Sequence, residues 1–290
     1  MTTDDFSLLI FTNKMLVLKY FRGCVHPIRT IATNAPPTKF LDIPNGNKIA
    51  YEKVEGSAAL PTVMFVPGFM NRMDEDMPRH LRDFCMKKNY TFVTYDPICV
   101  GDSPGDLSSV EFQDWVENAG SVLEHLGSEQ NIVIGISMGG WISLWMASQE
   151  MYKEKIKSMM VIAPAVNFFR PFYANTFKKL SQEGKNKLEK GEIYHIQDEF
   201  GIKPLKKSFA ENSSNFELDL SEPLEITCPV KILHGLSDET IPYKNSMGVM
   251  EKIMSEEVEL IYRKGAEHRF SDEKSLRLVE NCLEKLIDDN

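Results

Sequence analysis

The feature that most constrains the fold is a regular alternation of short apolar runs and longer helical patterns after Pro37. Short apolar runs bounded by turn residues predict buried strands, and an opening hairpin is expected around Asn45-Gly46. The predicted strands cover residues 62–68, 91–96, 131–137, 158–164, 230–235 and 258–265. The predicted helices cover residues 77–88, 110–127, 138–155, 245–254 and 274–288. This alternation predicts an α/β fold with a mostly parallel central sheet and helices on both faces.

The alternation fails once, between residues 167 and 225. This stretch is rich in aromatic residues and lysines and contains no obvious buried parallel strand. A structureless loop of that length is uncommon in a compact domain, so we predict a helical cap over one end of the sheet. The expected organisation is a core of residues 39–166 and 226–290, a cap at 167–225, and a separate N-terminal segment at 1–38.

The N-terminal segment differs in composition from the rest of the chain. Residues 15–38 carry three basic side chains and no acidic one, although Asp4 and Asp5 precede them. Basic composition without acidic residues is typical of a mitochondrial transit peptide. We therefore expect a transit peptide and a mitochondrial location; the alternatives are a disordered tail and the cytoplasm. No stretch here reaches the ~20 apolar residues that a membrane span needs.

Charge and cysteine content narrow the classes of partner. The formal net charge of −9 and the pI near 5.3 argue against nucleic acid, whose phosphates the protein would repel. Five cysteines are scattered without metal-type spacing, which predicts free thiols and no structural zinc. We expect a monomer that acts on a small substrate and needs no cofactor or metal.

The strongest local motif is Gly135-Ile136-Ser137-Met138-Gly139, which follows an apolar strand and opens a helical pattern. Glycines two residues before and after a serine relieve the crowding of a tight strand-to-helix turn that presents a nucleophile. The alternative is an ordinary turn in which Ser137 caps the helix. The strand-to-helix context favours Ser137 as a nucleophile.

A serine nucleophile needs a base and an orienting carboxylate, and both follow Ser137 in the chain. Asp238 lies just beyond the predicted strand 230–235, with Glu239 beside it as an alternative acid. His268 follows the last predicted strand and is the candidate base. His234 precedes the acid and would break the order serine, acid, histidine, so we interpret it as a structural residue with a local hydrogen bond.

Acyl transfer also requires donors for the oxyanion of the tetrahedral intermediate, usually two backbone N–H groups. Met138, directly after the nucleophile, is one predicted donor. Phe69, in the loop Pro67-Gly68-Phe69-Met70, is the other. An ordinary turn at a strand end is the alternative for that loop.

Together these motifs resemble the mitochondrial palmitoyl-protein thioesterase type of α/β-hydrolase-domain protein, a family also described as acyl-glucuronide esterases. The resemblance runs from about residue 40 to 287 and includes F-V-P-G-F, G-I-S-M-G-G-W, T-C-P-V-K-I-L-H-G, L-S-D-E-T-I-P, N-S-M-G-V and G-A-E-H-R. It implies the α/β-hydrolase fold and Ser137, Asp238 and His268 as the triad. One departure is the segment 95–103, where an aromatic residue and G-x-G-x-S usually follow the aspartate. This loop usually borders the pocket, so with Pro97 and Cys99 here the resemblance does not specify the shape of the acyl pocket.

The predicted function is hydrolysis of acyl thioesters or esters, including those of S-acylated proteins, through an acyl-enzyme. The alternatives are a general carboxylesterase or lipase-like hydrolase and a non-catalytic binding protein of the same fold. In the predicted cap, five aromatic residues form either an acyl-binding wall or ordinary packing. They are Phe168, Phe169, Phe172, Tyr173 and Phe177.

Overall fold

The computed structural model describes residues 36–44, 46–198 and 201–288. The elements below all belong to one compact unit, Thr38–Asn290. The predicted transit peptide at 1–38 lies almost entirely outside the described residues. Within them, no helix has the length and apolarity that crossing a membrane requires, and the cysteines Cys85, Cys228 and Cys282 are free.

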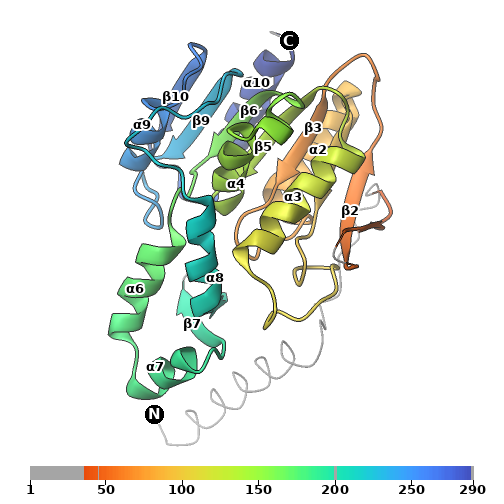
Figure 1. Ribbon diagram of the computed structural model, residues 1–290. Coiled ribbons are helices and arrows are strands. Elements are labelled where there is room, and N and C mark those ends of the chain that lie inside the picture. The colour runs from red at the N-terminus through yellow and green to blue at the C-terminus, as the bar shows by residue number, and fades with distance from the viewer. Residues whose placement is uncertain (1–35, 45, 199–200, 289–290) are drawn as a thin grey trace, which may run out of the picture. The chain divides into compact units, whose positions relative to one another are not determined.

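An eight-stranded sheet forms the centre of this unit (Figure 1). The first two pairings, β1 with β2 and β2 with β4, are antiparallel, and every later pairing is parallel. The mostly parallel sheet and the opening hairpin are therefore as predicted. In spatial order the strands are β1 (Lys39–Asp42), β2 (Lys48–Val54), β4 (Phe92–Tyr95), β3 (Thr62–Val66), β5 (Asn131–Ile136), β6 (Ile156–Ile162), β9 (Val230–Gly235) and β10 (Val258–Arg263).

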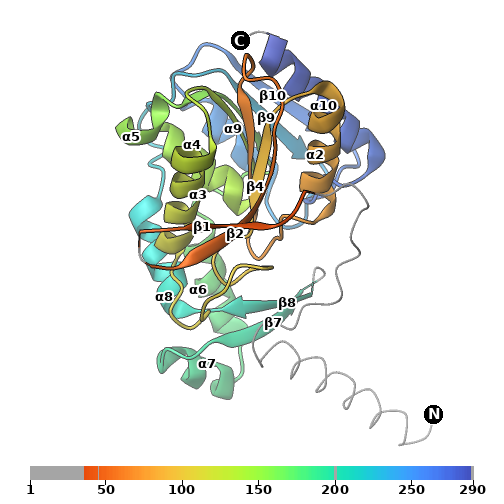
Figure 2. The same cartoon turned by 90° about the vertical axis from the view of Figure 1, so that its right-hand side faces the viewer.

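Helices cover both faces of the sheet, as Figure 2 shows for α3 and α4 on one side and α2 and α10 on the other. Helices α2 (Asp76–Lys88) and α10 (Glu273–Asp288) pack on the apolar side chains of one face. Helices α3 (Phe112–Leu126), α4 (Met138–Ala147) and α9 (Lys244–Met250) cover the other. Two separate apolar cores result, one on each side of the sheet.

The helix predicted over residues 138–155 is broken near its middle. Helix α4 ends at Ala147, and a short α5 (Glu150–Lys153) follows. Between them Gln149 adopts extended backbone, and the Ser148 hydroxyl donates to the carbonyl of Trp145. A serine that bonds to a preceding carbonyl competes with the helical pattern, which explains the early end.

Residues 167–225, the insertion, contain helices and also a small antiparallel hairpin. The prediction of helices alone missed the hairpin, because its strands are short, partly exposed and contain Pro204 and Gly201. A search for buried parallel strands does not detect such segments. The elements are α6 (Phe169–Lys179), α7 (Gln182–Glu189), β7 (Tyr194–Asp198), β8 (Gly201–Leu205), α8 (Lys207–Asn212) and the 3₁₀ helix η1 (Ser213–Phe216).

Parallel pairing places the carboxyl ends of β3, β5, β9 and β10 at one edge of the sheet. Ser137 follows β5 directly, Asp238 lies in the loop after β9, and His268 lies in the loop after β10. Ligand sites of open α/β sheets form at this edge. The fold therefore gathers the predicted site residues at one place.

Candidate active site

Ser137 stands on a tight turn between β5 and α4. Its φ of 53° lies in the left-handed region that residues other than glycine rarely adopt. A Cβ at Gly135 would collide with the carbonyl oxygen of Gly139, and a Cβ at Gly139 would collide with that of Val66. Glycine is therefore required at both positions of the motif. The Ser137 side chain makes no capping hydrogen bond, which disfavours the helix-cap alternative.

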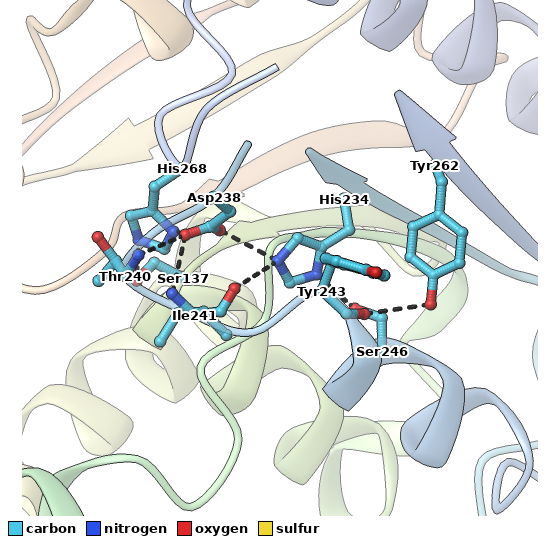
Figure 3. A network of polar contacts seen from close by, with 9 residues as sticks. All are labelled: Ser137, His234, Asp238, Thr240, Ile241, Tyr243, Ser246, Tyr262 and His268. Carbon is cyan, nitrogen blue, oxygen red and sulfur yellow. Dashed lines mark hydrogen bonds and ion pairs between the residues drawn. The ribbon is translucent and has the colours of Figure 1, made fainter. Parts of the chain in front are cut away.

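Three side chains from distant parts of the sequence meet beside this turn (Figure 3). His268 Nε2 lies 3.0 Å from Ser137 Oγ, and His268 Nδ1 lies 2.8 Å from Asp238 Oδ2. Because an ionised carboxylate only accepts hydrogen bonds, Nδ1 carries the proton and Nε2 accepts from the serine hydroxyl. These contacts have the geometry that a serine nucleophile, its base and an orienting acid require.

The Asp238 carboxylate is buried and accepts four hydrogen bonds. The backbone N–H groups of Thr240 and Ile241 donate to Oδ1 at 2.9 and 2.8 Å. Two histidines, His234 at 3.0 Å and His268 at 2.8 Å, donate to Oδ2. Burial alone would raise the pKa of Asp238, but the hydrogen bonds from His234 and His268 outweigh it and hold that pKa well below its usual range. Asp238 is therefore a stable anion facing the base.

The two alternatives near the acid, Glu239 and His234, are placed very differently. Glu239 is exposed, and the carboxylate that contacts His268 belongs to Asp238. His234 is fully buried and makes the local hydrogen bond that was predicted, but its partner is Asp238 itself. The four-residue spacing in H-G-L-S-D is the only sequence signal for this contact. The path of the loop after β9, which the sequence does not specify, brings the two groups together.

The predicted oxyanion donors lie beside Ser137. Met138 is the first residue of α4, where backbone N–H groups lack partners inside the helix. The loop after β3 folds against the nucleophile, since a Cβ built on Gly68 would lie 3.3 Å from the Ser137 Cβ. Phe69, from that loop, lines the same cavity as Ser137 and Met138. The N–H groups of Phe69 and Met138 stay our predicted donors.

A largely apolar cavity opens onto Ser137 and His268. It encloses about 1170 Å³, its opening to solvent included. Four of the five aromatic residues singled out in the insertion line it, and Phe177 instead stacks on Tyr173 with ring centroids 5.8 Å apart. Phe169 also packs against Phe69, with ring centroids 5.1 Å apart. This side chain therefore both lines the cavity and packs the insertion onto the core. The lining aromatics of the insertion are Phe168, Phe169, Phe172, Tyr173 and Phe209.

The hairpin and α8 also contribute to the wall, which sequence reasoning missed. Pro204 and Leu205 from β8, and Lys206 after it, line the cavity together with Val110 and Trp115 of the core. No local motif marks these positions. They reach the cavity only because the insertion folds back onto the edge of the sheet.

The unusual segment 95–103 does not act as expected, because neither Pro97 nor Cys99 lines the cavity. Instead the segment supports the cavity wall from behind. The carbonyl of Ile98 accepts a hydrogen bond at 3.0 Å from the indole of Trp115, which does line the cavity. Asp96 accepts at 2.7 Å from the backbone N–H groups of Met73 and Asp102, which holds the segment in place.

The chain is similar in sequence to known proteins. Residues 61–190 match the family model described as the alpha/beta hydrolase fold. The chain is 26% identical to the Homo sapiens mitochondrial palmitoyl-protein thioesterase ABHD10, over 86% of this chain and 79% of that protein. The Mus musculus protein of the same name is 28% identical over 85% of this chain and 80% of that protein.

Two solved structures show the same architecture. The mouse alpha/beta hydrolase domain-containing protein 10 superposes with a TM-score of 0.75 at 27% identity, covering 87% of this chain and 99% of that one. A putative hydrolase from Agrobacterium vitis superposes with a TM-score of 0.77 at 21% identity, covering 87% and 98%. The chain has the α/β-hydrolase fold. It is a hydrolase, and the resemblance to the mitochondrial palmitoyl-protein thioesterases is confirmed.

Proposed function

We propose that this α/β hydrolase is a serine hydrolase that cleaves acyl thioesters or esters through a covalent acyl-enzyme on Ser137. The observation that carries the proposal is the 3.0 Å contact between Ser137 Oγ and His268 Nε2 at the mouth of an apolar cavity. A serine hydroxyl is a weak nucleophile unless a base takes its proton, and this contact supplies the base.

In the first half-reaction, Ser137 Oγ attacks the acyl carbonyl carbon while its proton passes to His268 Nε2. Asp238 stabilises the resulting imidazolium through Nδ1. The backbone N–H groups of Phe69 and Met138 bind the oxyanion. The tetrahedral intermediate collapses as the bond to the leaving thiol or alcohol breaks, and His268 returns its proton to that leaving group.

In the second half-reaction, water replaces the leaving group. His268 Nε2 takes a proton from water, and the hydroxide attacks the acyl-enzyme carbonyl. Collapse of the second tetrahedral intermediate breaks the bond to Ser137 Oγ, which recovers its proton from the imidazolium. The acid is released and the resting hydrogen bond between Ser137 and His268 re-forms.

The cavity favours substrates with an apolar acyl group, because its wall is built mainly from aromatic and aliphatic side chains. The ABHD10 relatives are named palmitoyl-protein thioesterases, and this name supports long-chain S-acyl proteins as substrates. The resemblance also extends to acyl-glucuronide esters. The chemistry at Ser137 is the same for thioesters and oxoesters. Only a comparison of rates on the two kinds of substrate can therefore distinguish a thioesterase from a carboxylesterase.

The first test replaces the nucleophile. Ser137→Ala removes the attacking oxygen and is expected to lower kcat for a p-nitrophenyl ester at least about 10⁴-fold. The matched control is Ser148→Ala, because that hydroxyl bonds to the carbonyl of Trp145 and to the side chain of Gln149, does not line the cavity, and should leave kcat unchanged. Labelling by a fluorophosphonate probe should disappear in the first variant and persist in the second. Hydrolysis that survives Ser137→Ala would refute the proposal.

The second test identifies the leaving group. Matched thioesters and oxoesters of the same acyl chain, from acetyl to palmitoyl, are compared by kcat/KM. A thioesterase should prefer the thioester and improve with chain length as more of the cavity is filled. Equal or better rates on oxoesters would instead identify a carboxylesterase.

A mitochondrial location is part of the proposal. It rests on the basic composition of residues 15–38 and on the word mitochondrial in the names of the ABHD10 relatives. Residues 1–38 fused to a fluorescent protein should direct it to mitochondria, whereas residues 39–290 fused in the same way should not. A cytoplasmic signal from the first fusion would contradict this location.

A further inference from the structure

His234 lies directly behind the acid of the proposed triad (Figure 3). It is on β9, its side chain is fully buried, and its Nε2 is 3.0 Å from Asp238 Oδ2 and 3.1 Å from the carbonyl oxygen of Ile241. Its Nδ1 is 2.7 Å from the hydroxyl oxygen of Ser246, on α9. Every nitrogen of this buried ring therefore has a partner, and one partner is the acid.

The partners determine where the ring proton sits. Both neighbours of Nε2, a carboxylate and a backbone carbonyl, can only accept, so Nε2 carries a proton and donates to both. In the neutral ring Nδ1 then accepts, and Ser246 Oγ–H donates to it. The hydroxyl of Ser246 thus selects the tautomer that donates to Asp238.

We propose that His234 is a positioning residue for the catalytic acid, and that Ser246 positions His234. This inference rests on the proposed function, in which Asp238 orients His268. Asp238 Oδ1 is held by two backbone N–H groups and Oδ2 by two imidazoles. The bond from His234 fixes the rotation of the carboxylate so that Oδ2 faces His268 Nδ1.

The two histidines share one oxygen, and this sharing has a kinetic consequence. A carboxylate oxygen that already accepts a bond from His234 carries less free charge for His268. Loss of the His234 donor therefore makes Asp238 a stronger partner for the imidazolium of His268. A purely structural residue in the core would not affect the protonation of the base.

The surroundings of His234 supply few other ionisable groups. Along the neighbouring strand β10 its register partner is Tyr262, whose hydroxyl donates to the carbonyl of Tyr243. The charged group that contacts His234 is Asp238, and α9 contributes the neutral Ser246. Tyr262 holds the same loop without touching the acid, so it provides a matched control.

The central experiment compares His234→Met with His234→Gln in the full chain. Methionine fills the space without a donor, whereas the amide nitrogen of glutamine reaches about as far as Nε2. His234→Met should lower kcat about 10- to 100-fold, the range for a lost hydrogen bond to a charged group, with KM unchanged. It should also move the acid limb of the kcat/KM profile to higher pH by several tenths of a unit. His234→Gln should restore most of the wild-type kcat and most of the wild-type pH profile.

Two further variants test the chain of contacts. Ser246→Ala removes the donor to Nδ1 and should reproduce a smaller part of the His234→Met effect on kcat and on the pH profile. Tyr262→Phe breaks a hydrogen bond in the same region and should lower only the melting temperature. Fluorophosphonate labelling counts the folded active sites, so kcat can be expressed per active site.

The outcomes separate this inference from the proposed function. If Ser137→Ala keeps the wild-type rate, the proposed function is wrong. If Ser137 is essential but His234→Met has the wild-type kcat and pH profile per active site, the role of His234 is wrong. The same conclusion follows if His234→Gln is as impaired as His234→Met, because the donor would then be irrelevant.

Discussion

Asp238 stays ionised over the pH range in which imidazole side chains ordinarily titrate. Hydrogen bonds from two histidines, together with those from the backbone, overcome the effect of burial and hold its pKa well below the usual range. Asp238 should therefore take up no proton along the acid limb of the activity profile. We predict that log kcat/KM for an ester falls on the acid side with a limiting slope of one rather than two.

The matched control for this profile is Glu239→Gln. Glu239 is the adjacent carboxylate, but it is exposed, so its removal should leave both the rate and the slope unchanged. A limiting slope of two would show that a second group, with Asp238 the first candidate, gains a proton in the same range. A slope of one in both proteins supports the placement of Asp238 as a permanently charged partner.

In Asp96, unlike Asp238, the effect of burial on the pKa exceeds the effect of the hydrogen bonds. The free energy of unfolding should therefore depend on pH through this group. Its side chain is 1% exposed, and burial raises its pKa to about 7 despite hydrogen bonds from Met73 and Asp102. Between about pH 4 and 7 the folded chain keeps a proton that the unfolded chain has released, so this group lowers stability as pH rises, by on the order of 4 kcal/mol. Asp96→Asn cannot titrate. Its stability deficit relative to wild type should shrink from pH 4.5 to pH 8.

Urea unfolding of both proteins at the two pH values measures this difference, because titration of all other groups cancels in the comparison. The replaced amide loses one acceptor for the backbone N–H groups that Asp96 holds, so a deficit at low pH is expected. A deficit that instead grows with pH would mean that the carboxylate is favoured in the folded state.

At the scale of elements, a buried ion pair joins β2 to α2. Arg82 Nη1 lies 3.0 Å from Glu52 Oε2, and the two side chains are 3% and 1% exposed. Arg82→Met removes the cation beside the buried Glu52 carboxylate and should destabilise the chain by about 3–5 kcal/mol. The exposed pair Arg79 and Asp76 in the same helix is the control, and Arg79→Met should cost less than about 1 kcal/mol.

Replacing both buried partners completes this test. The double variant Glu52→Leu with Arg82→Met removes both charges and should recover much of the stability lost in the single variant. Equilibrium urea unfolding measures all four proteins. If Arg82→Met and Arg79→Met lower the free energy of unfolding by the same amount, the buried pair contributes no more to stability than the exposed pair.

The strand ends that hold the site could be predicted because each signal is local. The apolar run before Ser137, the glycines around it, and the loops that begin after β9 and β10 are all read from neighbouring residues. The role of His234 could not be predicted. It depends on how the loop after β9 folds back so that Asp238 contacts His234 on the same strand. The β7–β8 hairpin was missed for a related reason: its strands are only partly buried and lack the apolar pattern of the core strands.

For the chain as a whole, the site is complete only where the insertion meets the core. Trp141 of α4 donates through its indole to the carbonyl of Phe216, and the side chain of Asn167 exchanges two hydrogen bonds with the backbone of Leu218. The bond from Trp141 ties the insertion to the core, and the bonds between Asn167 and Leu218 join the beginning of the insertion to its end. The insertion supplies part of the cavity wall, and the loops at the strand ends supply Ser137 and His268, the proposed nucleophile and base.

Lys206 lines the cavity next to the hairpin and also ties the insertion to the core. Its Nζ donates at 2.9 Å to the carbonyl of Val110 and at 2.9 Å to Oε1 of Glu111, and its side chain is 9% exposed. Lys206→Met keeps the length of the side chain but removes these donors. We predict faster amide hydrogen exchange in β7, β8 and α8, with unchanged exchange in β3 and β5, because only the insertion loses a tie to the core.

The neighbouring Lys207 is the control, because its exposed side chain pairs with Glu211 inside the insertion. Lys207→Met should leave exchange in the hairpin unchanged. If the cavity wall holds the acyl chain, Lys206→Met should also raise KM for palmitoyl substrates more than for acetyl substrates, since only the long chain reaches the hairpin. Equal changes for both chain lengths would mean that the acyl group lies elsewhere, even if hydrogen exchange responds as expected.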